Sequence, residues 1–290
     1  MRFLVQIAQT FAFRLNHPKP GVEGFATIAG AEAAARGVVL SAFPLLMYRA
    51  YGDAKIVSEF YFGVGILAVL TVMSVPQILQ HVPRARVYRG AMSLYILTAI
   101  LGMIGGSLTA AALCLNAMAA ATSFVCYNAY VMDFVAKPDF SRLETKRLLY
   151  GGIGWTVGPF LGVELMRLWP GAPFILSGLA GALMLLILHR MNPGNGTVIQ
   201  RAAGASANPL RFLQRFFSQP RLISGWLFAL TRSCGWWVFI VYLGIYAVQM
   251  GLPDWVGGLA TSTANAGLFI APLMFGWVRR RPVREAVQTG

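Results

Sequence analysis

The chain has 290 residues, of which 57% are hydrophobic and only 12% are charged, and its mean hydropathy is +0.62. Soluble domains carry about 25% charged residues, so this composition excludes a soluble globular protein and indicates an integral membrane protein. The formal net charge of +14 does not indicate nucleic-acid binding, because the basic residues lie between apolar runs, as in proteins that orient themselves in a bilayer.

Residues 1–23 predict a cytoplasmic amphipathic segment that lies on the membrane surface. Apolar Phe3 and Ile7 recur at helical spacing, with polar Gln6 and Gln9 between and after them. The glutamines interrupt the apolar core that a signal peptide needs, and no cleavage site follows. A disordered tail is the alternative interpretation of the same residues.

The first apolar run, residues 24–48, is long enough to cross a bilayer, yet it carries Glu32 and Arg36 one helical turn apart. About 12 residues at ~1.5 Å each place Arg36 roughly 18 Å along the helix, near the bilayer midplane. A charge at that depth is costly unless it faces protein, water or a ligand, so Arg36 is a functional-site candidate. The alternative is that Arg36 only pairs with Glu32 and holds the helix in register.

Further apolar runs of membrane-spanning length follow along the chain. They are residues 59–80, 90–107, 109–135, 148–168, 174–190, 222–247 and 255–278. The sequence therefore predicts an all-α integral membrane protein with eight transmembrane helices, six in a bundle at 24–190 and two of a second bundle at 222–278. A flexible, basic cytoplasmic linker at 191–221 separates the two groups, and residues 279–290 form a basic cytoplasmic tail.

The distribution of Lys and Arg predicts how these helices are oriented. With the N-terminus in the cytoplasm, 19 of the 24 basic residues lie on the cytoplasmic side, three lie on the opposite side and two lie within spans. Short loops rich in basic residues stay in the cytoplasm. We therefore expect a multi-pass protein of a bacterial inner membrane with both termini in the cytoplasm.

An internal repeat relates the first span to the seventh. Arg36 is followed by Pro76 after 40 residues, and Arg232 is followed by Pro272 after the same interval, an offset of 196. A basic cluster follows each proline. The chain therefore has the pattern of one helix bundle and the beginning of its copy.

Six helices, a basic cytoplasmic linker and a second group in the same orientation resemble the major facilitator superfamily of transporters. In that family two six-helix halves are related as parallel repeats, and the substrate binds between them at the midplane. The fifth span carries Gly154, Gly158, Pro159 and Gly162, a pattern similar to the glycine-rich motif of the family's proton-coupled exporters. Such small residues let two helix backbones approach closely, and the proline lets the helix bend. Ordinary tight helix packing is the alternative for this motif.

The sequence departs from the family in two ways. The family's signature between its second and third helices has a glycine, an acid and a basic run, whereas residues 80–86 are basic but lack the glycine and the acid. In addition, residue 290 corresponds to residue 94 of the first copy, so the resemblance implies that the last four helices are missing. We expect either a fragment or an eight-helix descendant of a transporter.

Arg36 and Arg232 are the expected substrate-binding pair, because a repeat axis along the membrane normal brings them to equivalent positions at the midplane. Two guanidinium groups there suit a carboxylate or phosphate, which each can bind bidentately. The superfamily's organophosphate exchangers place arginines comparably, so the resemblance favours an anionic substrate. Tyr127, Asn128 and Asn265 are expected to line the same path, with packing or interface anchoring as the alternative for any single aromatic residue.

Glu32 and Asp133 are the expected proton-coupling residues. A low-dielectric environment favours the neutral form of a carboxyl group, which can then carry a proton. Protonation of Glu32 would free Arg36 and so couple proton uptake to anion contact. For Asp133, which has Lys137 four residues on, a gate or a structural ion pair is the alternative.

The expected function is secondary active transport of a small solute, such as an organic anion or a drug-like compound, by alternating access with proton coupling or exchange. No cofactor, metal or nucleic-acid partner is expected, and Cys114, Cys126 and Cys234 are expected to be buried reduced thiols. A transport-inactive fragment or scaffold derived from a transporter is the first alternative. A membrane-embedded enzyme is less favoured, because the three histidines are dispersed. The oligomeric state stays open.

Overall fold

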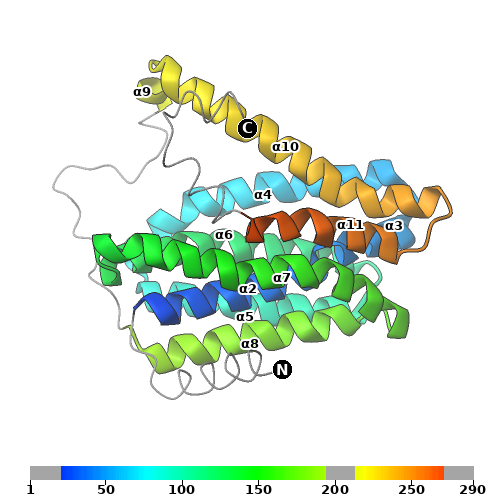
Figure 1. Ribbon diagram of the computed structural model, residues 1–290, viewed down its shortest axis with the longest axis horizontal. Coiled ribbons are helices and arrows are strands. Elements are labelled where there is room, and N and C mark those ends of the chain that lie inside the picture. Colours follow the sequence, from blue (N-terminus) through cyan, green and yellow to red (C-terminus); the bar gives the residue numbers. More distant parts are fainter. Residues whose placement is uncertain (1–20, 194–212, 271–290) are drawn as a thin grey trace.

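The computed structural model describes residues 21–193 and 213–270, and every regular element in these ranges is helical (Figure 1). The helices are α2 (Val22–Leu40), α3 (Ala42–Tyr51), α4 (Ala54–His81), α5 (Arg84–Ile104), α6 (Leu108–Phe134), α7 (Phe140–Leu168), α8 (Ala172–Met191), α9 (Leu213–Phe217), α10 (Pro220–Gln249) and α11 (Trp255–Ala266). Short 3₁₀ turns, η1 (Lys137–Asp139) and η3 (Gly267–Phe269), precede α7 and follow α11. The predicted all-α class is confirmed.

Six helical stretches within the described residues are long and apolar enough to cross a membrane, namely α2 with α3, α4, α5, α6, α8 and α10. The 29-residue α7 is not among them, because its Gly, Pro and charged residues lower its hydropathy. The described part of the eighth expected span is the 12-residue α11 with η3, and the remainder lies outside the described residues. The count of eight spans and the domain boundaries therefore stay predictions. Most of residues 1–23 and 191–221, and all of 279–290, also lie outside the described ranges.

The first expected span is two helices rather than one. α2 ends at Leu40 and α3 begins at Ala42, with Ser41 between them. Pro44 lies in the first turn of α3 and has no amide hydrogen to donate to the carbonyl of Leu40, so the helical hydrogen-bond ladder is interrupted at this point. The break lies beyond Arg36, toward the predicted outer side.

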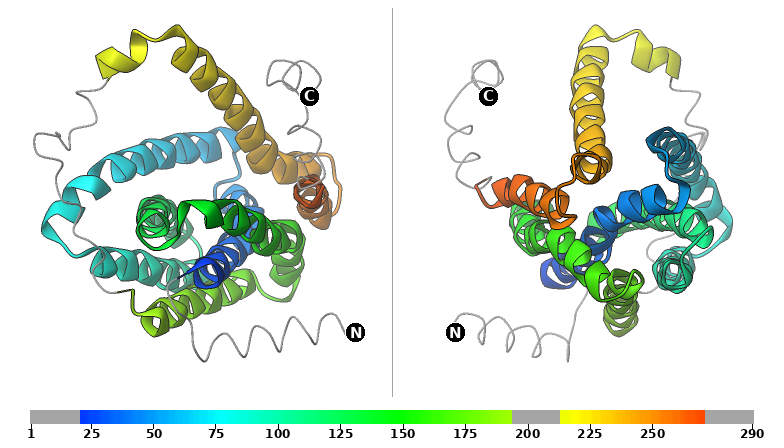
Figure 2. Two further views of the ribbon diagram at one scale, coloured as in Figure 1. Left: turned by 60° about the vertical axis from the view of Figure 1, so that its left-hand side comes forward. Right: turned by 90° about the vertical axis from the view of Figure 1, so that its right-hand side faces the viewer.

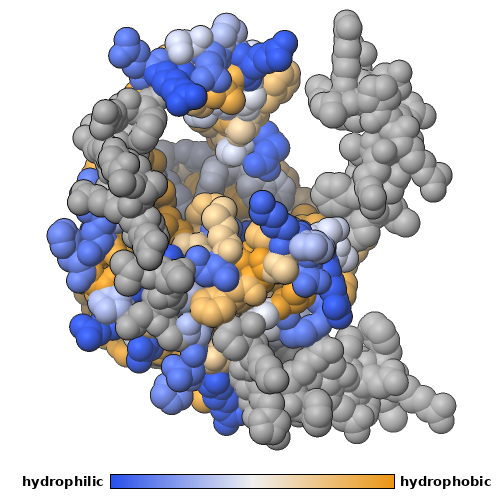
Figure 3. Space-filling model, turned by 90° about the vertical axis from the view of Figure 1, so that its left-hand side faces the viewer, coloured by the Kyte–Doolittle hydropathy of each residue, from blue (hydrophilic) through white to orange (hydrophobic). Residues whose placement is uncertain are grey.

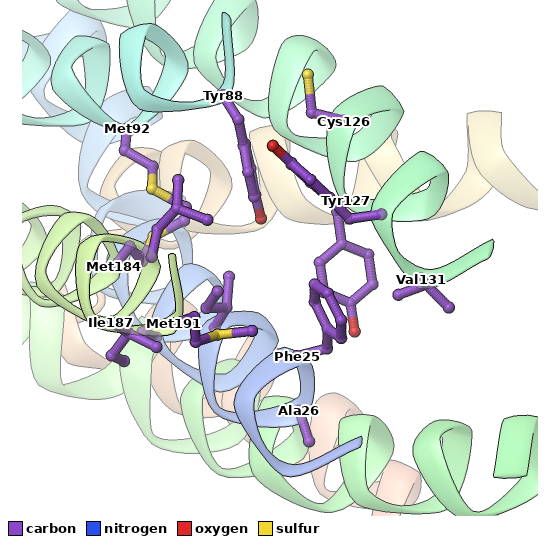
Figure 4. Packing of buried hydrophobic residues seen from close by; sticks show 14 of the residues in the cluster. Phe25, Ala26, Tyr88, Met92, Cys126, Tyr127, Val131, Met184, Ile187 and Met191 are labelled. Atoms are coloured by element: carbon purple, nitrogen blue, oxygen red, sulfur yellow. The ribbon is translucent and has the colours of Figure 1, made fainter. Parts of the chain in front are cut away.

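The first bundle packs around α2, which lies against α7 and α8, while α5 lies between α6 and α8 and α4 lies on α6 (Figure 2). Its largest buried cluster joins α2, α5, α6 and α8 (Figure 4). The cluster includes Phe25, Tyr88, Met92, Tyr127, Met184 and Ile187. Lipid tails are as apolar as these side chains, so the bundle is held by close packing and polar contacts rather than by the hydrophobic effect.

α10 joins this bundle at one end only. Its C-terminal part packs against α3 and α11, whereas its N-terminal part diverges from the bundle (Figures 1 and 2). The buried residues of α10 all lie from Ile240 to Ala247. Figure 3 faces the diverging end and shows a hollow between the start of α10, where hydrophilic side chains gather, and the rest of the molecule. By the predicted orientation this is the cytoplasmic end.

The three cysteines differ in burial. Cys126 is buried, Cys114 is partly buried and Cys234 is exposed, and all three are free thiols. The expectation of three buried thiols is therefore wrong for Cys234, because it lies on the part of α10 that stands away from the bundle.

Candidate functional site

The glycine motif of α7 lies along α2. A Cβ atom on Gly154 would come within 2.6 Å of the backbone of α2, and one on Gly158 would come within 2.5 Å of the carbonyl carbon of Gly37. A Cβ atom on Gly162 would likewise overlap the backbone of α2. Glycine alone allows two backbones to approach this closely. We call this contact the glycine seam, and because it flanks Arg36 it fixes the position of that residue.

Pro159, the remaining motif residue, lies where α7 meets α11. A Cβ atom on Gly258 of α11 would come within 2.9 Å of the Pro159 carbonyl oxygen, so these backbones are also close. The amide of Phe160, next to the proline, donates to the Ser262 hydroxyl at 3.0 Å. A hydroxyl from a neighbouring helix commonly satisfies backbone groups beside a proline in membrane helices. The motif therefore contacts both groups of helices, with the second contact through α11.

Arg36 and Glu32 form the charged centre of α2. Arg36 Nη1 lies 3.7 Å from Glu32 Oε1, and the Arg36 guanidinium lies over the ring of Trp155 in α7, 5.2 Å from its centroid. The Tyr95 hydroxyl of α5 donates to Glu32 Oε1 at 3.1 Å. The Arg36 side chain is 31% exposed and that of Glu32 is 15% exposed. A separation of 3.7 Å is an ion pair without a hydrogen bond, so the guanidinium keeps its N–H donors available to a ligand.

Arg232 has a different setting. It is exposed on the diverging part of α10, and within residues 21–193 and 213–270 no ion pair or hydrogen bond involves it. Its convergence with Arg36 on one ligand stays a prediction.

Tyr127 and Asn128 of α6 lie next to each other but differ in their contacts. Tyr127 is buried, and the guanidinium of Arg147 from α7 lies over its ring at 5.4 Å from the centroid. Its hydroxyl has no hydrogen-bond partner among the described residues. Asn128 donates to the carbonyl of Phe124 in its own helix at 2.8 Å. Asn265 of α11 is buried and also bonds within its own helix.

Asp133 pairs with Arg84 at the start of α5, and not with Lys137. Arg84 is only 6% exposed and also lies over the ring of Tyr130, 5.1 Å from its centroid. This buried ion pair joins α5 to α6 and favours the structural alternative for Asp133. The basic residue Arg84 follows the connection between α4 and α5, and its acidic partner lies on α6.

Sequence reasoning missed a set of polar contacts between the first bundle and α10–α11, at the end where α10 joins it. We call this set the outer clamp, and it consists of the ion pair Arg49–Asp254 and the hydrogen bonds Gln249–Tyr48 and Ser58–Tyr242. The charges of Arg49 and Asp254 on the same predicted side of the membrane were the only sequence signal for it. Among the described residues, no cluster of His, Cys, Asp or Glu side chains could hold a metal ion.

The comparison with protein families agrees with this architecture. A sequence model of the Major Facilitator Superfamily matches residues 25–288. The chain belongs to the Major Facilitator Superfamily. The members of this superfamily are membrane transporters of small-molecule solutes, so the chain is a multi-pass membrane protein of a transporter family. No curated protein and no solved structure matches the chain.

The superfamily match runs through α10 and α11 as well as through the first bundle. The resemblance inferred from the repeat and the glycine motif is thereby confirmed.

Proposed function

We propose that this superfamily protein is a secondary transporter of a small organic anion, with Arg36 as the main anion-binding group. The proposal depends on the exposure and contacts of the Arg36 side chain. Its guanidinium is partly exposed in the middle of the first span, lies over Trp155, and makes no hydrogen bond to a described residue.

The chemistry of this arrangement favours an anion. A guanidinium presents a planar fork of donors that matches the two oxygens of a carboxylate or phosphate. Trp155 supports one face of the fork, and the glycine seam holds the helix that carries it. Arg232 would supply a second positive charge when the diverging part of α10 approaches the bundle.

Glu32 supplies the proposed coupling. Its carboxylate competes with the anion for Arg36 at 3.7 Å, so protonation of Glu32 would release Arg36 to the ligand. Either a proton or a second anion could therefore drive the cycle. The outer clamp is closed while α10 diverges at its other end, an arrangement that supports alternating access with the hollow of Figure 3 open to the predicted cytoplasmic side.

The orientation is part of the proposal, with both termini in the cytoplasm of a bacterial inner membrane. The distribution of basic residues supports it.

Uptake into proteoliposomes tests the proposal. The probes are radiolabelled benzoate, citrate and glucose 6-phosphate, with choline and glucose as cationic and neutral comparisons. We expect uptake of at least one anion, and a loss of about tenfold or more in Arg36→Ala. Arg36→Lys should retain part of the uptake, because it keeps the charge but not the bidentate fork.

Arg167→Ala is the matched control, since Arg167 is an exposed arginine at the far end of α7 that pairs with Glu164 at 3.0 Å. It should leave uptake unchanged, whereas Arg232→Ala should reduce it. Uptake of choline or glucose that survives Arg36→Ala would contradict an anion carrier. Absence of any flux through correctly inserted wild type would support the transport-inactive alternative.

A further inference from the structure

Three buried tyrosines lie near Glu32, two of them on the side of Glu32 toward one end of the first bundle. Tyr95 and Tyr88 of α5 are 0% exposed, and Tyr127 of α6 is 3% exposed. The Tyr95 hydroxyl bonds to Glu32 at 3.1 Å, while the hydroxyls of Tyr88 and Tyr127 have no hydrogen-bond partner in the described part of the chain. Figure 4 shows Tyr88 and Tyr127 projecting into the same interior from two helices.

These residues lie at graded depths. α2 and α5 begin, and α6 ends, at the predicted cytoplasmic end of the bundle. At ~1.5 Å per residue, the backbone of Tyr88 lies about 6 Å into its helix and that of Tyr127 about 10 Å from the end of α6. Glu32 lies about 15 Å into α2 and Tyr95 roughly 16 Å into α5, so these two are level with each other. The backbones of Tyr88 and Tyr127 therefore lie between that of Glu32 and this end.

Charged side chains lie near both Glu32 and Tyr127. Glu32 interacts electrostatically with Arg36 of its own helix and with Arg147 of α7. It also interacts electrostatically with the three tyrosines of the series, Tyr88, Tyr95 and Tyr127. Arg147 is 35% exposed and lies over the Tyr127 ring. Tyr127 is thus the member of the series that borders a solvated group.

Packing alone does not explain the hydroxyls. A buried hydroxyl without a partner is unfavourable, and phenylalanine would fill the same space without that cost. A hydroxyl both donates and accepts a hydrogen bond, so a series of them, bridged by water, can pass a proton along.

We propose that Tyr127, Tyr88 and Tyr95 form a proton route between Glu32 and the predicted cytoplasmic end of the first bundle. Each hydroxyl oxygen accepts one proton and releases its own, so the tyrosines end unchanged and one proton is gained or lost at the Glu32 carboxylate. Arg36 and Trp155 lie on the α7 side of Glu32, so this route is separate from the anion site. The inference rests on the proposed function, because it requires Glu32 to carry the coupled proton.

A pH jump on the full-length protein in liposomes tests the route without knowledge of the solute. Protonation of Glu32 weakens its pairing with Arg36, and the resulting movement of the guanidinium over Trp155 changes the fluorescence of that indole. A stopped-flow jump from about pH 8 to about pH 5 should produce a fluorescence phase. The phase should be absent in Glu32→Gln and in Trp155→Phe.

The double variant Y88F/Y127F removes two hydroxyls and should slow this phase about tenfold while leaving its amplitude unchanged. Y246F is the matched control, because Tyr246 is exposed on α10. An unchanged rate in Y88F/Y127F, a phase that persists in Glu32→Gln, or the absence of any phase in wild type would overturn the route. Anion uptake is measured separately, so a failure of the route is distinguished from a failure of the proposed function.

Discussion

α7 makes two contacts that differ in kind. Against α2 it presents three glycines, and the two backbones lie so close that no side chain fits between them. Against α11 it presents one close glycine contact and a single hydrogen bond, from Phe160 to Ser262. The first contact runs along three helical turns, whereas the second combines one close approach of the backbones with one hydrogen bond. We therefore expect the first bundle to move as one body relative to α10–α11 during transport.

The largest expected effect comes from breaking the glycine seam. In Gly162→Leu the new side chain overlaps the backbone of α2 near Val38, and backbone cannot move aside as a flexible side chain can. We expect a loss of at least about 3 kcal/mol in the free energy of unfolding and little protein in the membrane. Thermal unfolding of the detergent-purified protein measures this.

Gly235→Leu is the control for the seam, because a Cβ atom at Gly235 of α10 meets nothing within 4 Å. It should insert and unfold like wild type. Equal losses in the two variants would show that the seam is no tighter than an exposed helix surface.

A smaller effect is expected at the contact between α7 and α11. Ser262→Ala leaves the Phe160 amide without its acceptor, and we expect a loss of about 1 kcal/mol in the free energy of unfolding. Thr263→Ala removes a neighbouring hydroxyl that bonds only to its own helix, at 2.9 Å from the carbonyl of Leu259, and should change little. If Ser262→Ala matches Thr263→Ala in a thermal unfolding assay, the contact between α7 and α11 does not depend on this bond.

The smallest expected effect is at the outer clamp. The side chains of Arg49 and Asp254 are 44% and 29% exposed, so their ion pair contributes about 0.2–1 kcal/mol. Asp254→Arg should open the clamp more often. A cysteine substituted for the buried Val57 should then react with an impermeant maleimide roughly two- to fivefold faster than in the presence of the intact ion pair. The exchanged pair R49D/D254R should restore slow labelling. Fast labelling in the exchanged pair would mean that charge pairing does not hold this end closed.

Local features of the fold could be predicted from the sequence. The apolar runs fix helices because a buried backbone in lipid must satisfy its own hydrogen bonds, and Gly154, Gly158 and Gly162 lie at a spacing that puts them on one helix face. Pro44 carried the signal for the break between α2 and α3, since it has no amide hydrogen to donate to the Leu40 carbonyl.

Partners far apart in the sequence could not be predicted in this way. Arg84 and Asp133 are 49 positions apart, and Arg49 and Asp254 are 205 positions apart. Their pairing depends on how the helices are arranged, which no local pattern contains. Likewise, the 196-residue repeat places Arg36 and Arg232 at equivalent positions in two helices. How their side chains face each other depends on the tilt of α10, which the sequence pattern does not contain.

The exposed Cys234 has a practical consequence. It lies two residues from Arg232 on the diverging part of α10, while Cys126 is buried and Cys114 is partly buried. A fluorophore attached to this native thiol would follow, in single molecules, how often the helix swings inward, and the wild-type chain already provides the attachment point.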